Sequence, residues 1–113
     1  MEVLESSLCG LPLLKVTGEV DHSAAPALED SVQRGLRVND MRLFVDFTDC
    51  SYLDSSGLSV LLCAVREVRG KGWVGAIAPG PNLLRLFELV GLTSVADFHV
   101  FSGSEEAEAA LEG

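Results

Sequence analysis

The spacing of apolar residues changes along the chain, and each change marks a predicted strand or helix. Apolar runs at residues 3–8 and 13–20 are typical of β-strands. Gly10 and Pro12 stand between the two runs and favour a turn. The chain is therefore expected to begin with a hairpin of two strands.

A helical period follows the hairpin. Ser23 is a suitable N-cap, and Pro26 falls in the first helical turn, where its missing N–H costs little. Gly35 lowers the helix propensity, so the pattern leaves the end of this helix open. The apolar face of the predicted helix carries Leu28, Val32 and Leu36.

The middle of the chain predicts a buried strand and then a long helix. Asn39 and Asp40 favour a turn, and residues 42–47 ("RLFVDF") then place apolar side chains next to one another, as in a mostly buried strand. Gly70 and Gly72 are predicted to end the helix that follows. Its single apolar stripe is formed by Leu58, Leu61, Leu62, Val65 and Val68.

The C-terminal part repeats the alternation of strand and helix. Strands are predicted over residues 73–78 and 95–101. Between them, Asn82 is the predicted N-cap of a short helix over residues 83–90. A last helix is predicted to begin at the N-cap Ser104, with acidic residues in its first turn.

The predicted order is β-β-α-β-α-β-α-β-α. Strands that alternate with helices are typical of a sheet with parallel neighbours, and the first hairpin makes this sheet mixed. No linker or repeat interrupts the pattern, so we expect one α/β domain over residues 1–113. With 48% hydrophobic residues, the chain can form a core of its own.

The net charge of −9 narrows the classes of partner. Nucleic-acid binding needs a basic surface that replaces counterions, and anionic membranes attract basic segments. Neither nucleic acid nor a membrane surface is therefore expected as a direct partner. A protein with a basic face is the partner that this charge favours.

The cysteines and the N-terminal residues indicate a compartment. Cys9, Cys50 and Cys63 are odd in number and form no C-x-x-C pair, which favours reduced thiols. The opening "MEVLESS" lacks the basic region of a secretory signal, and no apolar run approaches the ~20 residues of a membrane helix. We therefore expect a cytoplasmic protein. Because the cysteines are scattered relative to His22 and His99, no metal site is expected.

The stretch "DSSG" at the start of the long helix is the main candidate site. Asp54, Ser55, Ser56 and Gly57 stand where a helix exposes unpaired N–H groups and partial positive charge. From spacing alone, Ser55 or Ser56 is predicted as the N-cap, and Asp54 supports the first turn. A phosphoserine is also compatible with a helix N-terminus, so modification by another protein is a second interpretation.

A serine hydrolase and a phosphate-binding loop are two further interpretations of the candidate residues. A serine hydrolase would use Ser55 or Ser56 as nucleophile and His22 as base, but the G-x-S-x-G pattern of a nucleophile elbow is absent. A phosphate-binding loop needs more glycine than "DSSG" supplies, and the two prolines of "APGPN" remove N–H donors. No cofactor is therefore expected.

Three stretches resemble the signatures of STAS domains, and above all those of bacterial anti-sigma factor antagonists. They are "VTGEVDHSAAPAL" (residues 16–28), "LFVDFTDCSYLDSSGLSVLL" (residues 43–62) and "LLRLFELVGL" (residues 83–92). They occur in the order found in the family and span nearly the whole chain. The resemblance implies a STAS-like mixed β-sheet of about five strands, with about four helices packed mainly on one side.

The resemblance also implies a switch. In this family the unmodified antagonist binds an anti-sigma factor serine kinase and frees the sigma factor, and phosphorylation of the serine after the motif aspartate ends binding. A PP2C-type phosphatase resets the switch. Carried over, Ser55 is the phosphorylation site, and the partner-binding residues are Asp21, Asp54, Ser55, Ser56 and Gly57. No catalytic residue is implied.

Two alternatives stay open at this point. STAS domains also serve as scaffolds or regulatory modules in larger complexes, and sequence separates these roles poorly. The serine hydrolase is the third interpretation. A complete D-S-S-G in a short chain favours the anti-sigma factor antagonist.

Overall fold

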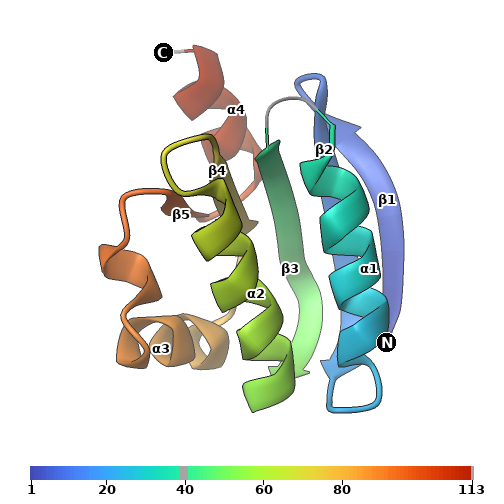
Figure 1. Ribbon diagram of the computed structural model, residues 1–113. Helices are drawn as coiled ribbons and strands as arrows, with labels where there is room; N and C mark the ends of the chain where they lie inside the picture. Colours follow the sequence, from blue (N-terminus) through green and yellow to red (C-terminus); the bar gives the residue numbers. More distant parts are fainter. Residues whose placement is uncertain (39–40, 113) are drawn as a thin grey trace.

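The computed structural model describes residues 1–38 and 41–112, and the predicted turn at Asn39 and Asp40 lies outside this part. Five strands form one sheet in the order β1-β2-β3-β4-β5 (Figure 1). β1 pairs with β2 in antiparallel orientation, and the other pairs are parallel, so the predicted hairpin and mixed sheet are confirmed. The strands are β1 (Glu2–Leu8), β2 (Leu11–Val20), β3 (Arg42–Leu53), β4 (Trp73–Ile77) and β5 (Phe98–Phe101).

Four α-helices pack on the sheet, three on one face and one on the other. They are α1 (Ala25–Leu36), α2 (Ser55–Val68), α3 (Pro81–Leu89) and α4 (Ser104–Glu112). Figure 1 shows α1 and α2 in front of the sheet and α4 behind it. The predicted α/β class and the concentration of helices on one side are thus confirmed.

Each face of the sheet has its own apolar core. The larger core joins α1, α2 and α3 to the strands and includes Phe47 and Phe87, whose ring centroids are 5.7 Å apart. The smaller core places Ala107 of α4 against Phe44 and Ile77. Most of the predicted α2 stripe is buried, but Leu62 remains 36% exposed. The helical period was therefore predicted correctly, whereas the width of its buried face was overestimated.

The structure moves several predicted boundaries. β3 continues past residue 47 to Leu53, because it pairs with β2 as far as Val20. β5 begins only at Phe98, since a 3-10 helix (η2, Leu92–Ser94) and a turn occupy the preceding segment. Asn82 lies inside α3, whose N-cap is Gly80, so that capping prediction is wrong. Ser104 is the first residue of α4 rather than the residue before it.

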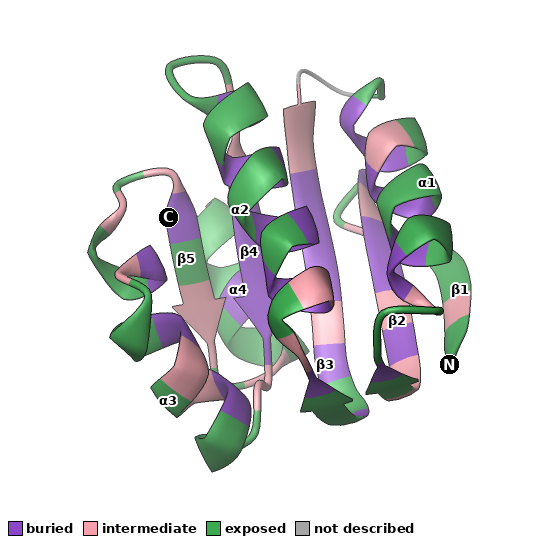
Figure 2. Ribbon diagram, turned by 60° about the horizontal axis from the view of Figure 1, so that its bottom comes forward, coloured by how far each residue is buried: buried purple, intermediate pink, exposed green. Residues whose placement is uncertain are grey.

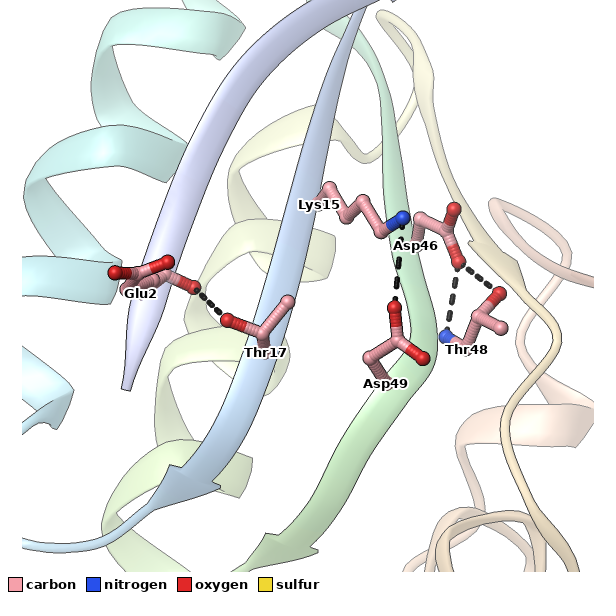
Figure 3. Close-up of polar contacts among 6 residues, drawn as sticks. All are labelled: Glu2, Lys15, Thr17, Asp46, Thr48 and Asp49. Carbon is pink, nitrogen blue, oxygen red and sulfur yellow. Dashed lines mark hydrogen bonds and ion pairs between the residues drawn. The ribbon is translucent and has the colours of Figure 1, made fainter.

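Polar side chains occupy part of the sheet face that α1 and α2 do not cover (Figure 3). Lys15 of β2 lies 3.4 Å from Asp49 of β3, and both side chains are about half exposed, so the ion pair adds little stability. The hydroxyl of Thr48 donates to Asp46 on the same strand. The β2–β3 register shifts beside this pair, after Lys15.

Candidate functional site

Two loops that are distant in sequence meet at the carboxyl ends of β2 and β3. The parallel register aligns Val20 with Leu53, the last residues of the two strands. The N–H of Asp54 donates to the Val20 carbonyl at 3.1 Å, which joins the loop before α2 to the loop before α1. Figure 2 shows the two strand ends side by side beneath the first turns of α1 and α2. The geometry thus places Asp21 and the D-S-S-G stretch in one neighbourhood, as the resemblance implies.

Asp54 is the N-cap of α2. Its backbone is extended, and its Oδ1 accepts the N–H of Ser56 at 2.8 Å and that of Gly57 at 3.1 Å. The predicted capping by Ser55 or Ser56 is therefore wrong. The cap falls one residue earlier because β3 ends at Leu53 and Asp54 is the first residue outside the strand.

Ser55 is the first residue of α2 and is exposed to solvent. Its carbonyl accepts a hydrogen bond from the Ser59 hydroxyl at 2.9 Å, which closes the first helical turn. Among the residues that the structure describes, none forms a hydrogen bond with the Ser55 hydroxyl. This hydroxyl is therefore available to an incoming protein.

Ser56 differs from Ser55 although it is the next residue. It is half-buried, and its Oγ lies 3.1 Å from Nδ1 of His22 in the loop before α1. The direction of this hydrogen bond depends on which imidazole nitrogen carries the proton. A groove of about 310 Å³ opens beside the pair, between α1 and α2, and is lined in part by Glu29 and Cys63. In the sequence, His22 was paired with Ser55 or Ser56 only as the base of a hydrolase, and the family resemblance gave His22 no role.

Asp21 organises the other loop. Its Oδ1 accepts the N–H of Ala24 at 3.0 Å and the hydroxyl of Ser23 at 2.8 Å. These bonds, first of all the one from Ser23, lower the pKa of the Asp21 carboxyl below its ordinary value. Ser23 is thus a donor to Asp21, and its prediction as the N-cap of α1 is wrong. The N-cap is Ala24, which has no capping side chain.

Gly57 is buried and has no room for a side chain. A Cβ at this position would lie 2.6 Å from Leu53 Cδ1 and 2.8 Å from Val20 Cγ1. The first turn of α2 therefore packs directly on the ends of β2 and β3. Gly57 offers no side chain to a partner, so any part in binding acts through the positions of Ser55 and Ser56.

The geometry includes one element of a hydrolase and lacks others. Ser56 and His22 are within hydrogen-bond distance, as a nucleophile and its base must be. However, the N–H groups of Ser56 and Gly57, which are the natural oxyanion donors here, already bind the Asp54 carboxylate. Within the described residues, no acid forms a hydrogen bond with His22 that would orient it.

The other candidate ligands do not converge. Across the described residues, no group of three or more His, Cys, Asp or Glu side chains has the geometry of a metal site. The three cysteines are free: Cys9 and Cys63 are exposed, and Cys50 is buried. Burial raises the pKa of the Cys50 thiol. In the described part of the chain, no helix is both long and apolar enough to cross a bilayer.

Comparison with known proteins agrees with this architecture. The sequence model of a family described as "Mlab, STAS domain" matches residues 10–97, which is most of the chain. The five-stranded mixed sheet, with the two loops meeting at the start of α2, defines the same kind of domain. The chain belongs to the STAS domain family.

Relatives with assigned names are anti-sigma factor antagonists. An anti-sigma-B factor antagonist of Listeria monocytogenes is 29% identical over 89 residues, which is 78% of each chain. The anti-sigma-F factor antagonist RsfB of Mycobacterium tuberculosis is 28% identical over 92% of this chain and 84% of its own. The crystal structure of an anti-sigma factor antagonist from Mycobacterium paratuberculosis superposes with a TM-score of 0.86 at 26% identity, covering 99% of this chain and 94% of that one.

Proposed function

We propose that this chain is an anti-sigma factor antagonist whose binding is switched by phosphorylation of Ser55. The observation that carries the proposal is the exposed Ser55 hydroxyl, which forms no hydrogen bond with any described residue and stands directly after an aspartate N-cap. The unmodified chain binds an anti-sigma factor serine kinase and so frees the sigma factor. The names and the fold of the relatives support this assignment.

The proposed partner surface is the meeting point of the two loops. The carboxyl ends of β2 and β3 bring together Asp21, Asp54, Ser55 and Ser56. Gly57 lets the first turn of α2 pack closely on these strand ends. The net charge of −9 favours a basic face on the partner. The chain acts here as a binding partner and as a substrate, with no catalytic activity of its own, and a PP2C-type phosphatase resets it in the cytoplasm.

The physical basis of the switch is competition for the first turn of α2. A phosphate on Ser55 would add a charge of about −1.5 to −2 beside the Asp54 carboxylate. Asp54 already accepts the N–H groups of Ser56 and Gly57, so the phosphate would find these donors taken by another anion. In the complex the phosphate would also lose part of its hydration, which costs free energy. A loss of about 3 kcal/mol would weaken binding more than a hundredfold.

Binding to the kinase tests the proposal. A tagged chain is used to capture its partner from cells that express it, and phosphosites are mapped after incubation with ATP. Ser55→Ala should bind the anti-sigma factor and resist modification, whereas Ser55→Asp should lose at least about a hundredfold in affinity. Ser94→Asp is the matched control, because it adds the same charge at an exposed position in η2. Equal binding by Ser55→Asp and the unsubstituted chain would refute the switch.

The alternatives give different results in the same experiment. A STAS scaffold in a larger complex would be captured with other proteins and would carry no phosphate at Ser55. A hydrolase is favoured only by the contact of His22 with Ser56, and it would cleave an ester substrate such as p-nitrophenyl acetate. That activity should then disappear in both His22→Ala and Ser56→Ala.

A further inference from the structure

Three hydroxyl groups lie at the meeting point of the two loops, and two of them have side-chain partners. The Ser23 hydroxyl donates to Asp21, and the Ser56 hydroxyl is bonded to His22. Only the Ser55 hydroxyl has no such partner among the described residues. Ser55 and Ser56 are adjacent residues in the first turn of α2, so a kinase that approaches this turn meets both serines. Something in the chain has to distinguish them.

Ser56 is restrained through both its backbone and its side chain. Its N–H is fixed by the Asp54 carboxylate at 2.8 Å, and its Oγ is fixed by His22 Nδ1 at 3.1 Å. To act as a phosphate acceptor, the Ser56 hydroxyl would have to break its bond with His22 and turn out of the groove between α1 and α2. A broken bond of this kind is typically worth about 1 kcal/mol, or about fivefold in rate.

The surroundings of Ser56 are also unfavourable for a phosphate. The groove that its side chain lines contains Glu29 of α1, and the Asp54 carboxylate lies on the other side of the Ser56 N–H. A phosphate on Ser56 would therefore meet two carboxylates. Among the described residues that line this groove, His22 is the only one with a basic side chain.

We propose that His22 is a specificity-determining residue for the switch: by holding the Ser56 hydroxyl, it directs phosphorylation to Ser55. The inference rests on the proposed function and adds a part for a residue outside the D-S-S-G stretch. His22 acts through Ser56 and is a positioning residue. The hydrogen bond joins two loops, so the side chain at position 22 determines which of Ser55 and Ser56 is phosphorylated.

The contact itself is measured without a kinase. The chain contains two histidines, so the imidazole ¹⁵N signals of labelled protein resolve His22 and His99, and His99 serves as an internal control. Ser56→Ala should shift the His22 Nδ1 signal and leave that of His99 in place. Ser55→Ala should move neither. An unchanged His22 signal in Ser56→Ala would overturn the inference.

The choice of acceptor is measured with the captured anti-sigma factor kinase and ATP, by mass spectrometry of the two sites. The unsubstituted chain should carry phosphate at Ser55 in large excess over Ser56. His22→Ala should raise the share at Ser56 by about fivefold or more, and in a Ser55→Ala background it should restore modification at Ser56. His22→Asn keeps a hydrogen-bonding group near the position of Nδ1 and should preserve the choice of Ser55. His99→Ala is the control.

Each failure has its own meaning. If the unsubstituted chain takes up no phosphate at Ser55, the proposed function fails. If Ser55 is modified but His22→Ala leaves the ratio of the two sites unchanged, the proposed function stands and the role of His22 is refuted. A histidine with only a structural role would alter the folding stability of the chain without altering this ratio.

Discussion

The loops before α1 and α2 each contain an aspartate that accepts backbone N–H groups, but the serines beside the two aspartates differ. Each helix follows a parallel strand, and each first turn has backbone N–H groups that need an acceptor. Before α1, the exposed Asp21 carboxylate accepts the N–H of the N-cap residue Ala24 and the Ser23 hydroxyl, but no N–H of the helix itself. Asp54 supplies an acceptor at α2, where it is half-buried.

The difference lies in the neighbouring hydroxyl groups. Before α1 the nearby hydroxyl belongs to Ser23 and is bonded to the Asp21 carboxylate itself. At α2 the Asp54 carboxylate binds only backbone N–H groups, and the exposed Ser55 hydroxyl has no hydrogen-bond partner in the described part of the chain. Ser55, the proposed acceptor, therefore stands beside an aspartate that forms no hydrogen bond with its hydroxyl, whereas Ser23 is bonded to the aspartate next to it. The following variants test how far this contrast holds.

The largest effect is expected from Gly57→Ala. The added Cβ would lie under 3 Å from Leu53 and from the stiff side chain of Val20, so α2 or the strand ends must shift. We expect the free energy of unfolding to fall by about 1–3 kcal/mol, measured by urea denaturation, despite the better helix propensity of alanine. Gly80→Ala, at the open start of α3, is the control and should change stability by a few tenths of a kcal/mol. Equal behaviour of the two variants would show that the start of α2 is not tightly packed.

Removal of the carboxylate of Asp54, which caps α2, or of Asp21, in the loop before α1, gives the next effect. Asp54→Ala deprives two N–H groups of their acceptor and should lower the free energy of unfolding by about 1 kcal/mol. Asp21→Ala should cost less, because the loop before α1 is exposed and water can replace the lost acceptor. Thermal or urea unfolding of the pair ranks them. A larger loss in Asp21→Ala would reverse the contrast between the two helix starts.

The smallest expected effect is the dependence of the free energy of unfolding on pH that Asp21 contributes. The pKa of Asp21 in the folded chain lies below its ordinary value of 3.8, chiefly because Ser23 donates to the carboxylate. The charged carboxylate therefore stabilises the fold above about pH 4, and this contribution is lost as the pH falls through the lowered pKa. The stability difference between the unsubstituted chain and Asp21→Asn should accordingly shrink between pH 5 and pH 2 in urea titrations.

Ser23→Ala removes the main cause of the lowered pKa. The pH-dependent difference should therefore be smaller when it is measured in that background. A difference that stays constant down to pH 2 would show that the Asp21 carboxylate gains nothing from folding.

The sequence alone predicted the order of strands and helices, because that order is written in local apolar periods. The α2 stripe and the buried face of α1 at Leu28, Val32 and Leu36 are examples. The hairpin was predicted from Gly10 and Pro12: Gly10 has the positive φ of 78° that a tight turn requires, whereas Pro12 lies inside β2. The neighbourhood of Asp21 and the D-S-S-G stretch came from the family resemblance rather than from any local pattern.

The capping residues were predicted wrongly because they depend on where a strand ends. Serine is a common N-cap, so Ser23 and Ser56 were natural choices. β3 ends at Leu53 only because its parallel partner ends at Val20, and this pairing is not visible in a local window. The contact of His22 with Ser56 has the same origin, since it exists only once two distant loops are brought together.

The bond between the Asp54 N–H and the Val20 carbonyl has a consequence for recognition. It joins the loop of Ser55, the proposed acceptor, to a second loop, so the surroundings of Ser55 exist only in the folded domain. A short peptide with the letters DSSG would lack the neighbouring loop, the fixed carboxylate and the half-buried Ser56. The proposed kinase would therefore recognise the folded surface around Ser55 rather than the DSSG sequence alone.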